Sequence, residues 1–286
     1  MKANKNNLYL MWSLAIILCM LMSLFALVFT SCAKSDGTRV KDNDKTLSIN
    51  DEQTPEPEQT DEPDQSGEPE PTAEPAPETP PTRLAETPDA GSEYLDKLVF
   101  LGDSTTYGLK YYEMLSGGSE TKQVWTPANG TLTLSYQSIA TIVYPETGEE
   151  ISISDAVERA KPEYMVITLG VNGVSFMDED NFVREYTDLV TRIREKSPDT
   201  KIILNSIYPV ASNYDHLDQI NNERICAANI WVEKIAEDTG TRYLNTYEAI
   251  VGSDGWLPQQ YQTDGMHLNP AGFNVILDYI KTHEYK

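Results

Sequence analysis

The chain has 286 residues, with 45 acidic against 22 basic side chains and a formal net charge of −23 at pH 7. Such an acidic chain is repelled by nucleic-acid phosphates and by anionic lipid surfaces, so we exclude nucleic acid as a partner. The composition divides the chain into three parts, residues 1–32, 33–92 and 93–286, of which only the last has the sequence of a folded domain.

Residues 1–32 have the composition of a membrane anchor. Lys2 and Lys5 precede an apolar run from Leu8 to Phe29. A helix needs about 20 apolar residues to cross the hydrocarbon core of a membrane, so this run is long enough to span one. The run ends in Phe-Thr-Ser-Cys, which resembles a bacterial lipobox whose cysteine, here Cys32, is lipidated; Phe29 stands where an aliphatic residue is usual. Two anchors fit: lipidation of Cys32, which we favour, and an uncleaved helix. Both place the rest of the chain on the extracytoplasmic face of the cell membrane.

Residues 33–92 contain ten of the 17 prolines, with 16 acidic against five basic residues. With few apolar side chains this segment cannot bury a core, and its like charges repel one another. We therefore predict an extended, disordered Pro/Glu-rich stalk. The alternative of a processed pro-segment is disfavoured because nothing in it is apolar enough to cover an active site.

Residues 93–286 are long enough for one domain. Short apolar runs are typical of strands buried on both faces of a parallel sheet, and longer stretches have helical periodicity. The expected strands are 98–101, 164–169 and 202–204, and the expected helices are 180–195, 220–237 and 271–281. This alternation predicts an α/β fold, a parallel sheet flanked by helices, with ligands bound outside the carboxyl ends of the strands.

Two further features of the domain lead to predictions. Residues 123–144 are rich in Thr, Val and Tyr around a turn at Gly130, which indicates a small antiparallel excursion. Cys226 is the only cysteine of this part, so it has no partner there for a disulfide. Its place in a helical pattern predicts a buried apolar residue.

Three side chains, far apart in the sequence, have the chemistry of a serine hydrolase. Ser104 follows the first strand and opens a predicted helix, while Asp264 precedes His267 by one short turn. A serine hydroxyl needs a base to take its proton, and an acid can fix the tautomer of that base. His267 is the natural base, because His216 lies in a polar loop and His283 in the C-terminal tail. Taken singly, Ser104 and Asp264 would only cap helices.

Three segments carry a family resemblance. Residues 102–108 (Gly-Asp-Ser-Thr-Thr-Tyr-Gly) resemble the first block of the GDSL, or SGNH, hydrolases, residues 170–173 (Gly-Val-Asn-Gly) the third, and residues 264–267 (Asp-Gly-Met-His) the last. The resemblance covers residues 95–284. It implies a three-layer, flavodoxin-like fold, a Ser104, His267, Asp264 triad, and neither a metal nor an organic cofactor.

The same resemblance implies an oxyanion hole formed by the Ser104 amide, a second-block glycine and the Asn172 side chain. Gly173 stands where the family usually has Asp, which removes a carboxylate that orients the Asn172 loop. We choose Gly130 as the second-block glycine, with Gly117 and Gly118 as alternatives. Asp103 is predicted to bond to the backbone of its turn rather than to act as an acid.

Three aromatic residues are candidates for substrate binding: Tyr107 in the first block, and Trp256 and Tyr261 shortly before Asp264. We expect a serine esterase that cleaves short acyl esters, such as acetyl esters, of cell-wall or extracellular polysaccharide or of another small molecule. The polysaccharide is inferred from the expected location. A lipid-directed esterase or lysophospholipase and an acyltransferase are alternatives. A non-catalytic carbohydrate-binding module on a stalk is an alternative of another class.

Overall fold

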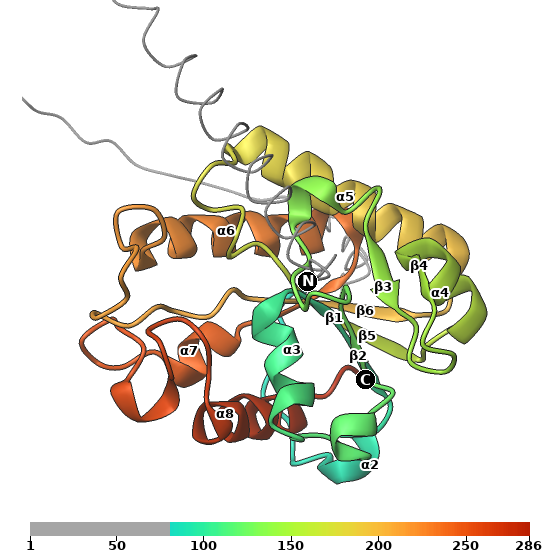
Figure 1. Ribbon diagram of the computed structural model, residues 1–286, viewed down its shortest axis with the longest axis horizontal. Helices are drawn as coiled ribbons and strands as arrows, with labels where there is room; N and C mark the ends of the chain where they lie inside the picture. Colours follow the sequence, from blue (N-terminus) through green and yellow to red (C-terminus); the bar gives the residue numbers. More distant parts are fainter. Residues whose placement is uncertain (1–80) are drawn as a thin grey trace, which may run out of the picture. The chain divides into compact units, whose positions relative to one another are not determined.

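The structure, a computed structural model, describes residues 81–286 (Figure 1). The predicted anchor, the lipidation site at Cys32 and the stalk up to residue 80 lie outside the described residues. Within residues 81–286, no helix is long and apolar enough to cross a membrane.

A sheet of five parallel strands forms the centre of the domain, in the order β2-β1-β5-β6-β7. Its strands are β1 (Leu98–Gly102), β2 (Val124–Trp125), β5 (Tyr164–Thr168), β6 (Lys201–Asn205) and β7 (Arg242–Leu244). Gly102 pairs with Thr168 across β1 and β5, so these neighbouring strands end side by side. The segments that carry Ser104 and Asn172, which follow β1 and β5, therefore leave the sheet at the same edge.

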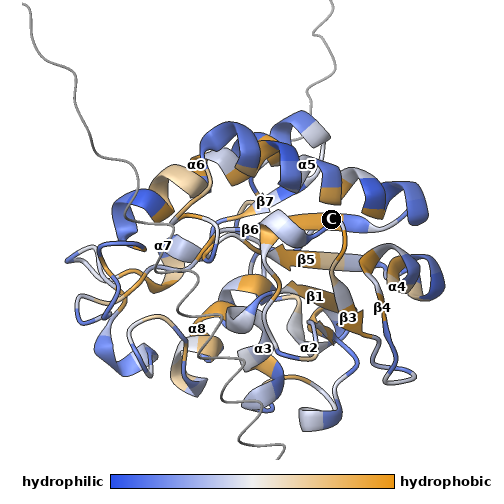
Figure 2. Cartoon of the chain, turned by 45° about the horizontal axis from the view of Figure 1, so that its top comes forward, coloured by the Kyte–Doolittle hydropathy of each residue, from blue (hydrophilic) through white to orange (hydrophobic). Residues whose placement is uncertain are grey.

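Helices cover both faces of this sheet. Along β5, Met165 and Ile167 pack into one buried cluster, while Tyr164 and Val166 pack into the other. The first cluster holds side chains of α4 (Ile153–Ala160), α5 (Glu179–Lys196) and α6 (Asn222–Thr239). The second holds side chains of α2 (Gly91–Leu95), α3 (Ser104–Tyr111), α7 (Thr246–Ile250) and α8 (Pro270–Lys281). Figure 2 shows the apolar strands between helices whose outer faces are hydrophilic. The predicted α/β fold with three layers is confirmed.

The long helices begin where the sequence supplies a cap. The Asp178 carboxylate accepts from the Asn181 amide at 2.9 Å before α5. Asn221 and Asn269 cap α6 and α8 in the same way. Each of these caps satisfies a backbone amide that has no partner within its helix. The three helices expected from periodicity are confirmed within two residues at each end. Three short 3₁₀ turns complete the fold: η1 (Gly118–Glu120), η2 (Leu134–Tyr136) and η3 (Gln259–Tyr261).

The antiparallel excursion expected over residues 123–144 lies later in the chain. β2 joins the main sheet in parallel with β1, whereas β3 (Thr141–Val143) pairs antiparallel with β4 (Glu150–Ser152). The turn of this hairpin is closed by the Tyr144 amide, which donates to the Glu149 carbonyl at 2.8 Å. Gly130 instead lies in the loop that leads from β2 to η2.

The folded domain begins before the predicted boundary at residue 93. The Leu84 amide donates to the Tyr243 carbonyl at 2.9 Å, and Arg83 forms a bidentate ion pair with Glu233 of α6. The Thr87 amide donates to the Thr282 carbonyl at 2.7 Å, and the Ala90 amide to the Lys281 carbonyl at 2.9 Å. Residues 81–92, which we assigned to the stalk, thus form a strap against β7 and the end of α8.

Cys226 is exposed rather than buried, so the prediction of an apolar core residue was wrong. Its neighbours Ile225 and Ala228 are fully buried on the inner face of α6. Cys226 lies 100° around the helix from Ile225, which turns it toward solvent.

Candidate active site

Ser104 is the first residue of α3, directly after the end of β1. The Asp103 carboxylate caps this helix and accepts from the Thr105 amide at 3.0 Å and from the Thr105 hydroxyl at 2.7 Å. The turn is tight enough to require glycine at 102, because a Cβ there would lie 2.1 Å from Thr106 Oγ1 and 2.4 Å from the Thr168 carbonyl. Strand, glycine and capped helix together hold Ser104 at the carboxyl edge of the sheet. The prediction that Asp103 bonds to its own turn is confirmed.

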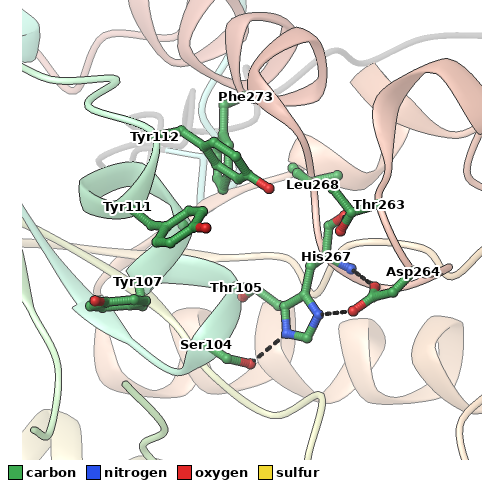
Figure 3. A pocket seen from close by; sticks show the side chains of 11 residues that line it. Ser104, Thr105, Tyr107, Tyr111, Tyr112, Thr263, Asp264, His267, Leu268 and Phe273 are labelled. Atoms are coloured by element: carbon green, nitrogen blue, oxygen red, sulfur yellow. Dashed lines mark hydrogen bonds and ion pairs between the residues drawn. The ribbon is translucent and has the colours of Figure 1, made fainter. Parts of the chain in front are cut away.

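The loop before α8 brings His267 and Asp264 to this serine (Figure 3). His267 Nε2 lies 2.9 Å from Ser104 Oγ, and His267 Nδ1 lies 2.7 Å from Asp264 Oδ2. An ionised carboxylate can only accept, so Nδ1 donates to Asp264 and Nε2 is left to accept from the serine hydroxyl. The structure thus brings together the three residues that the sequence predicted as a triad.

Asp264 also organises its own loop. Its Oδ1 accepts from the Met266 amide at 3.0 Å and from the His267 amide at 2.9 Å. Partial burial raises the pKa of Asp264, but hydrogen bonds from the His267 amide and ring and from the Met266 amide outweigh burial, so the pKa is held below its usual value. Asp264 is therefore anionic at neutral pH and can stabilise a positive charge on His267.

Asp103 is a second acid close to the site, in a different environment. Complete burial raises the pKa of Asp103 to about 6, although hydrogen bonds from Thr105 and the nearby His267 ring oppose the shift. Asp103 is only 1% exposed, and both hydrogen bonds from Thr105 go to its Oδ1. Its position is that of a structural cap below the nucleophile.

A cavity of about 250 Å³ opens above Ser104 and His267. Tyr107 and Tyr111 of α3 form one side and are exposed by 39% and 66%, while Tyr112 and Phe273 close the end away from the serine (Figure 3). Phe273 reaches α3 because position 108 is glycine: a Cβ there would lie 2.5 Å from Phe273 Cζ. Thr263 and Leu268 complete the wall on the histidine side.

Two of the three positions predicted for the oxyanion hole carry an N–H group without an acceptor among the described residues, although Asn172 is not one of the residues that line the cavity. The Asp103 carboxylate accepts from the Thr105 amide, and the Asp103 carbonyl accepts from the amides of Thr106 and Tyr107. The Ser104 amide has no acceptor among the described residues. Asn172 Nδ2 is buried and has no hydrogen-bond partner in the described part of the chain. Buried N–H donors without a partner are rare in native proteins. An oxygen atom of the substrate, present only during the reaction, would be an acceptor for this donor.

Gly130 is not a suitable third donor in this conformation, which contradicts our assignment. Its amide already donates to the Pro127 carbonyl at 2.8 Å and closes a turn in which Gly130 has φ of +74°. The alternatives Gly117 and Gly118 do not line the cavity, and the Gly118 amide donates to the Leu115 carbonyl.

Of the three aromatic candidates, only Tyr107 lines the cavity. Tyr261 packs against the core beneath α8. Trp256 belongs to a turn in which its carbonyl accepts from the Gly252 amide. Trp256 and Tyr261 were predicted because they precede Asp264 in the sequence, but the turns that carry them keep both side chains out of the cavity. Tyr111 was not predicted from the sequence, although it lies one helical turn beyond Tyr107, on the face of α3 that carries Ser104.

The other two histidines do not line the cavity. His216 is exposed, whereas His283 is buried and stacks on Tyr279 with ring centroids 3.7 Å apart. Within residues 81–286, no group of three or more His, Cys, Asp or Glu side chains is placed to hold a metal ion.

Comparison with known proteins agrees with this description. A protein of Streptococcus pneumonia assigned as a platelet activating factor shares 17% identity, with 68% of this chain and 89% of that chain covered and a TM-score of 0.50, which shows the fold. An assigned acylhydrolase of Bacteroides fragilis is 20% identical over 63% and 81% of the two chains, with a TM-score of 0.45. A carbohydrate esterase family 3 protein of Talaromyces cellulolyticus is 17% identical over 64% and 93%, with a TM-score of 0.43. No curated protein matches the sequence.

Fold and sequence together place the chain among the carboxylic-ester hydrolases. The model of the GDSL-like lipase/acylhydrolase family matches residues 100–275, and the chain belongs to that family. The alternative of a non-catalytic module is thereby set aside.

Proposed function

We propose that the domain cleaves short acyl esters of carbohydrates, with Ser104 as nucleophile, His267 as general base and Asp264 as its orienting acid. The observation that carries this proposal is the position of the His267 ring, 2.9 Å from Ser104 Oγ on one side and 2.7 Å from Asp264 Oδ2 on the other. These distances lie within the range over which a base can take a proton from a nucleophile.

The reaction follows from these contacts. Ser104 Oγ attacks the ester carbonyl as its proton moves to His267 Nε2, and Asp264 stabilises the imidazolium. The Ser104 amide and Asn172 Nδ2 donate to the oxyanion that forms. His267 then returns the proton to the departing hydroxyl, and the acyl group remains on Ser104. Water, deprotonated by His267, attacks this acyl-enzyme; the bond from the acyl carbon to Ser104 Oγ breaks, the acid is released, and His267 returns the proton to Ser104 Oγ.

The size of the cavity supports a small acyl group. Its volume of about 250 Å³ lies below the range of roughly 300–1,000 Å³ that is usual for ligand pockets. Tyr112 and Phe273 close the end of the cavity that lies away from the serine, which limits the length of acyl chain that the cavity can hold.

The mouth of the cavity supports a sugar as the alcohol part of the ester. The rings of Tyr107 and Tyr111 lie beside the serine, tilted by 39° with centroids 6.4 Å apart, and both are partly open to solvent. Exposed aromatic rings of this kind present apolar faces together with polar hydroxyls. The acidic balance of the domain disfavours anionic substrates.

A panel of p-nitrophenyl esters from acetyl to palmitoyl, together with acetylated xylose, tests this proposal. We expect kcat/KM to be highest for acetyl esters and to fall steeply beyond about four carbons, and we expect labelling of Ser104 by a serine-directed phosphonate. A preference for long chains would favour the lipid-directed alternative.

We propose that residues 1–32 hold the enzyme at the extracytoplasmic face of a membrane through Cys32 or through an uncleaved helix. Metabolic labelling with a fatty acid, compared between the native chain and Cys32→Ala, distinguishes these two anchors.

A further inference from the structure

A second groove, of about 560 Å³, lies next to the catalytic cavity and has no part in the chemistry described above. Its walls come from the segment between β2 and β3, from Thr141 at the start of β3 and from Glu150 of β4. The groove presents Tyr136 and Ile139, exposed by 63% and 77%, among the polar side chains of Asn129, Thr131 and Thr133.

The groove and the catalytic cavity share a wall. Asn129 and Thr131 line the groove, and Gly130 between them lies against Tyr107, which lines the cavity. A Cβ on Gly130 would lie 3.2 Å from Cγ of Tyr107, so backbone and ring are already in close contact. A molecule that lies over Ser104 and continues past Tyr107 therefore reaches the groove directly.

The exposed side chains belong to a well-anchored segment. Leu134 and Gln137, on either side of Tyr136, are each only 1% exposed. The Gln137 amide group donates to Asp188 of α5 at 2.9 Å and to Glu185 at 3.2 Å. The Thr131 amide donates to Asn129 Oδ1 at 2.9 Å and fixes the shared wall. These buried neighbours thus fix Tyr136 and Ile139 in solvent-exposed positions.

The chemistry of the lining selects one class of occupant. A tyrosine ring offers a face for stacking, while hydroxyl, amide and carboxylate groups offer the donors and acceptors that a sugar needs. None of the lining residues is basic, and Glu150 adds a negative charge, which disfavours phosphates and anionic lipid headgroups.

We propose that this groove binds further sugar units of a neutral polysaccharide whose esterified unit lies over Ser104. The inference rests on the proposed function, since it extends the same substrate beyond the catalytic cavity. Tyr136 supplies the stacking face, and Ile139 borders it.

Kinetics of the full chain test the groove with Tyr136→Ala and Tyr136→Phe. On partially acetylated xylan we expect Tyr136→Ala to raise KM several-fold, up to about tenfold, with kcat unchanged, because one stacking contact is lost. Tyr136→Phe keeps the ring and should retain most of the affinity. On acetylated xylose and p-nitrophenyl acetate, which are too small to reach the groove, both variants should match the native chain. An equal change on polymer and monomer, or no change on either, overturns the proposal.

Ile139→Ala has a matched control in Ile230→Ala, since Ile230 is exposed by 69% on α6, outside the groove. Only the Ile139 variant should raise KM for the polymer. Retardation in gels that contain xylan, glucomannan or acetylated chitosan measures binding without catalysis. If the native chain cleaves no ester, retardation lost in Tyr136→Ala still supports the groove, although the proposed function fails. Absence of retardation in every gel, or binding to phosphatidylcholine vesicles that Tyr136→Ala abolishes, refutes it.

Discussion

Replacing Asp264 by Asn tests how the His267 ring is held. The carboxylate makes three contacts: Oδ1 accepts from the amides of Met266 and His267 at 3.0 and 2.9 Å, and Oδ2 accepts from the ring at 2.7 Å. An asparagine oxygen can keep the first two, so the loop should stay in place. The new NH₂ group can only donate to Nδ1, and this reverses the third contact.

The consequence is an imidazole with its proton on Nε2, the atom that lies 2.9 Å from Ser104 Oγ. That nitrogen can then no longer accept the serine proton. A reversal of this kind costs on the order of 10⁴-fold in kcat, equivalent to roughly 5.5 kcal/mol of transition-state stabilisation. We expect KM to change little, because Asp264 orients the base and leaves the walls of the cavity as they are.

Initial rates of p-nitrophenyl acetate hydrolysis measure the effect, and thermal unfolding checks that the loop has survived. Asp278→Asn is a suitable control, since this acid on α8 is exposed and pairs with Lys281 at 2.9 Å, away from the site. It should retain native rates. If Asp264→Asn stayed within tenfold of the native kcat, the proposed role of the acid would be wrong.

Three further predictions concern other residues of the site. Ser104→Ala should remove esterase activity and phosphonate labelling with little loss of stability, as rates and denaturant unfolding would show; turnover above a few per cent would point to another nucleophile. Asn172→Ala should lower kcat on the order of a hundredfold with KM unchanged. Its unfolding free energy should not fall, because Nδ2 has no protein partner to lose; a raised KM at normal kcat would place Asn172 in ground-state binding instead. Burial raises the pKa of Asp103 to about 6, so the stabilisation from its bound proton is complete below pH 4 and is lost as pH rises through 6. Asp103→Asn should therefore be more stable than the native chain at pH 8, by up to about 3 kcal/mol, and similar to it at pH 4; urea unfolding with the same difference at both pH values would contradict this.

The sequence predicted those parts of the fold that have a long local signal. α5 shows its buried face as Phe182, Tyr186, Leu189, Val190 and Ile193, so its period was clear. β2 and β7 have only two and three residues, too few for any period, and their places in the sheet depend on contacts with distant strands. Cys226 was misjudged because an assignment to a helix does not by itself fix which side faces inward.

In the site, too, the residues that stand in short motifs were predicted, whereas the cavity around them was not. Ser104, Asp264 and His267 stand in short motifs, and the structure brings them together. The cavity depends on contacts across the fold: Phe273 reaches α3 only through the space left at Gly108. Gly130 was chosen for its place in the sequence, which says nothing about whether its amide is already bonded within a turn.

The strap formed by residues 81–92 has a mechanical consequence. It joins the end of α8 through the carbonyls of Lys281 and Thr282. α8 has 12 residues, so this junction lies about 18 Å along the helix from the end that follows His267. A pull on the chain before residue 81 would first load the hydrogen bonds of Thr82 and Leu84 to Tyr243 and the Arg83–Glu233 pair, and only then the hydrogen bonds to α8. The contacts of the strap therefore bear the tension before it reaches the loop that carries Asp264 and His267.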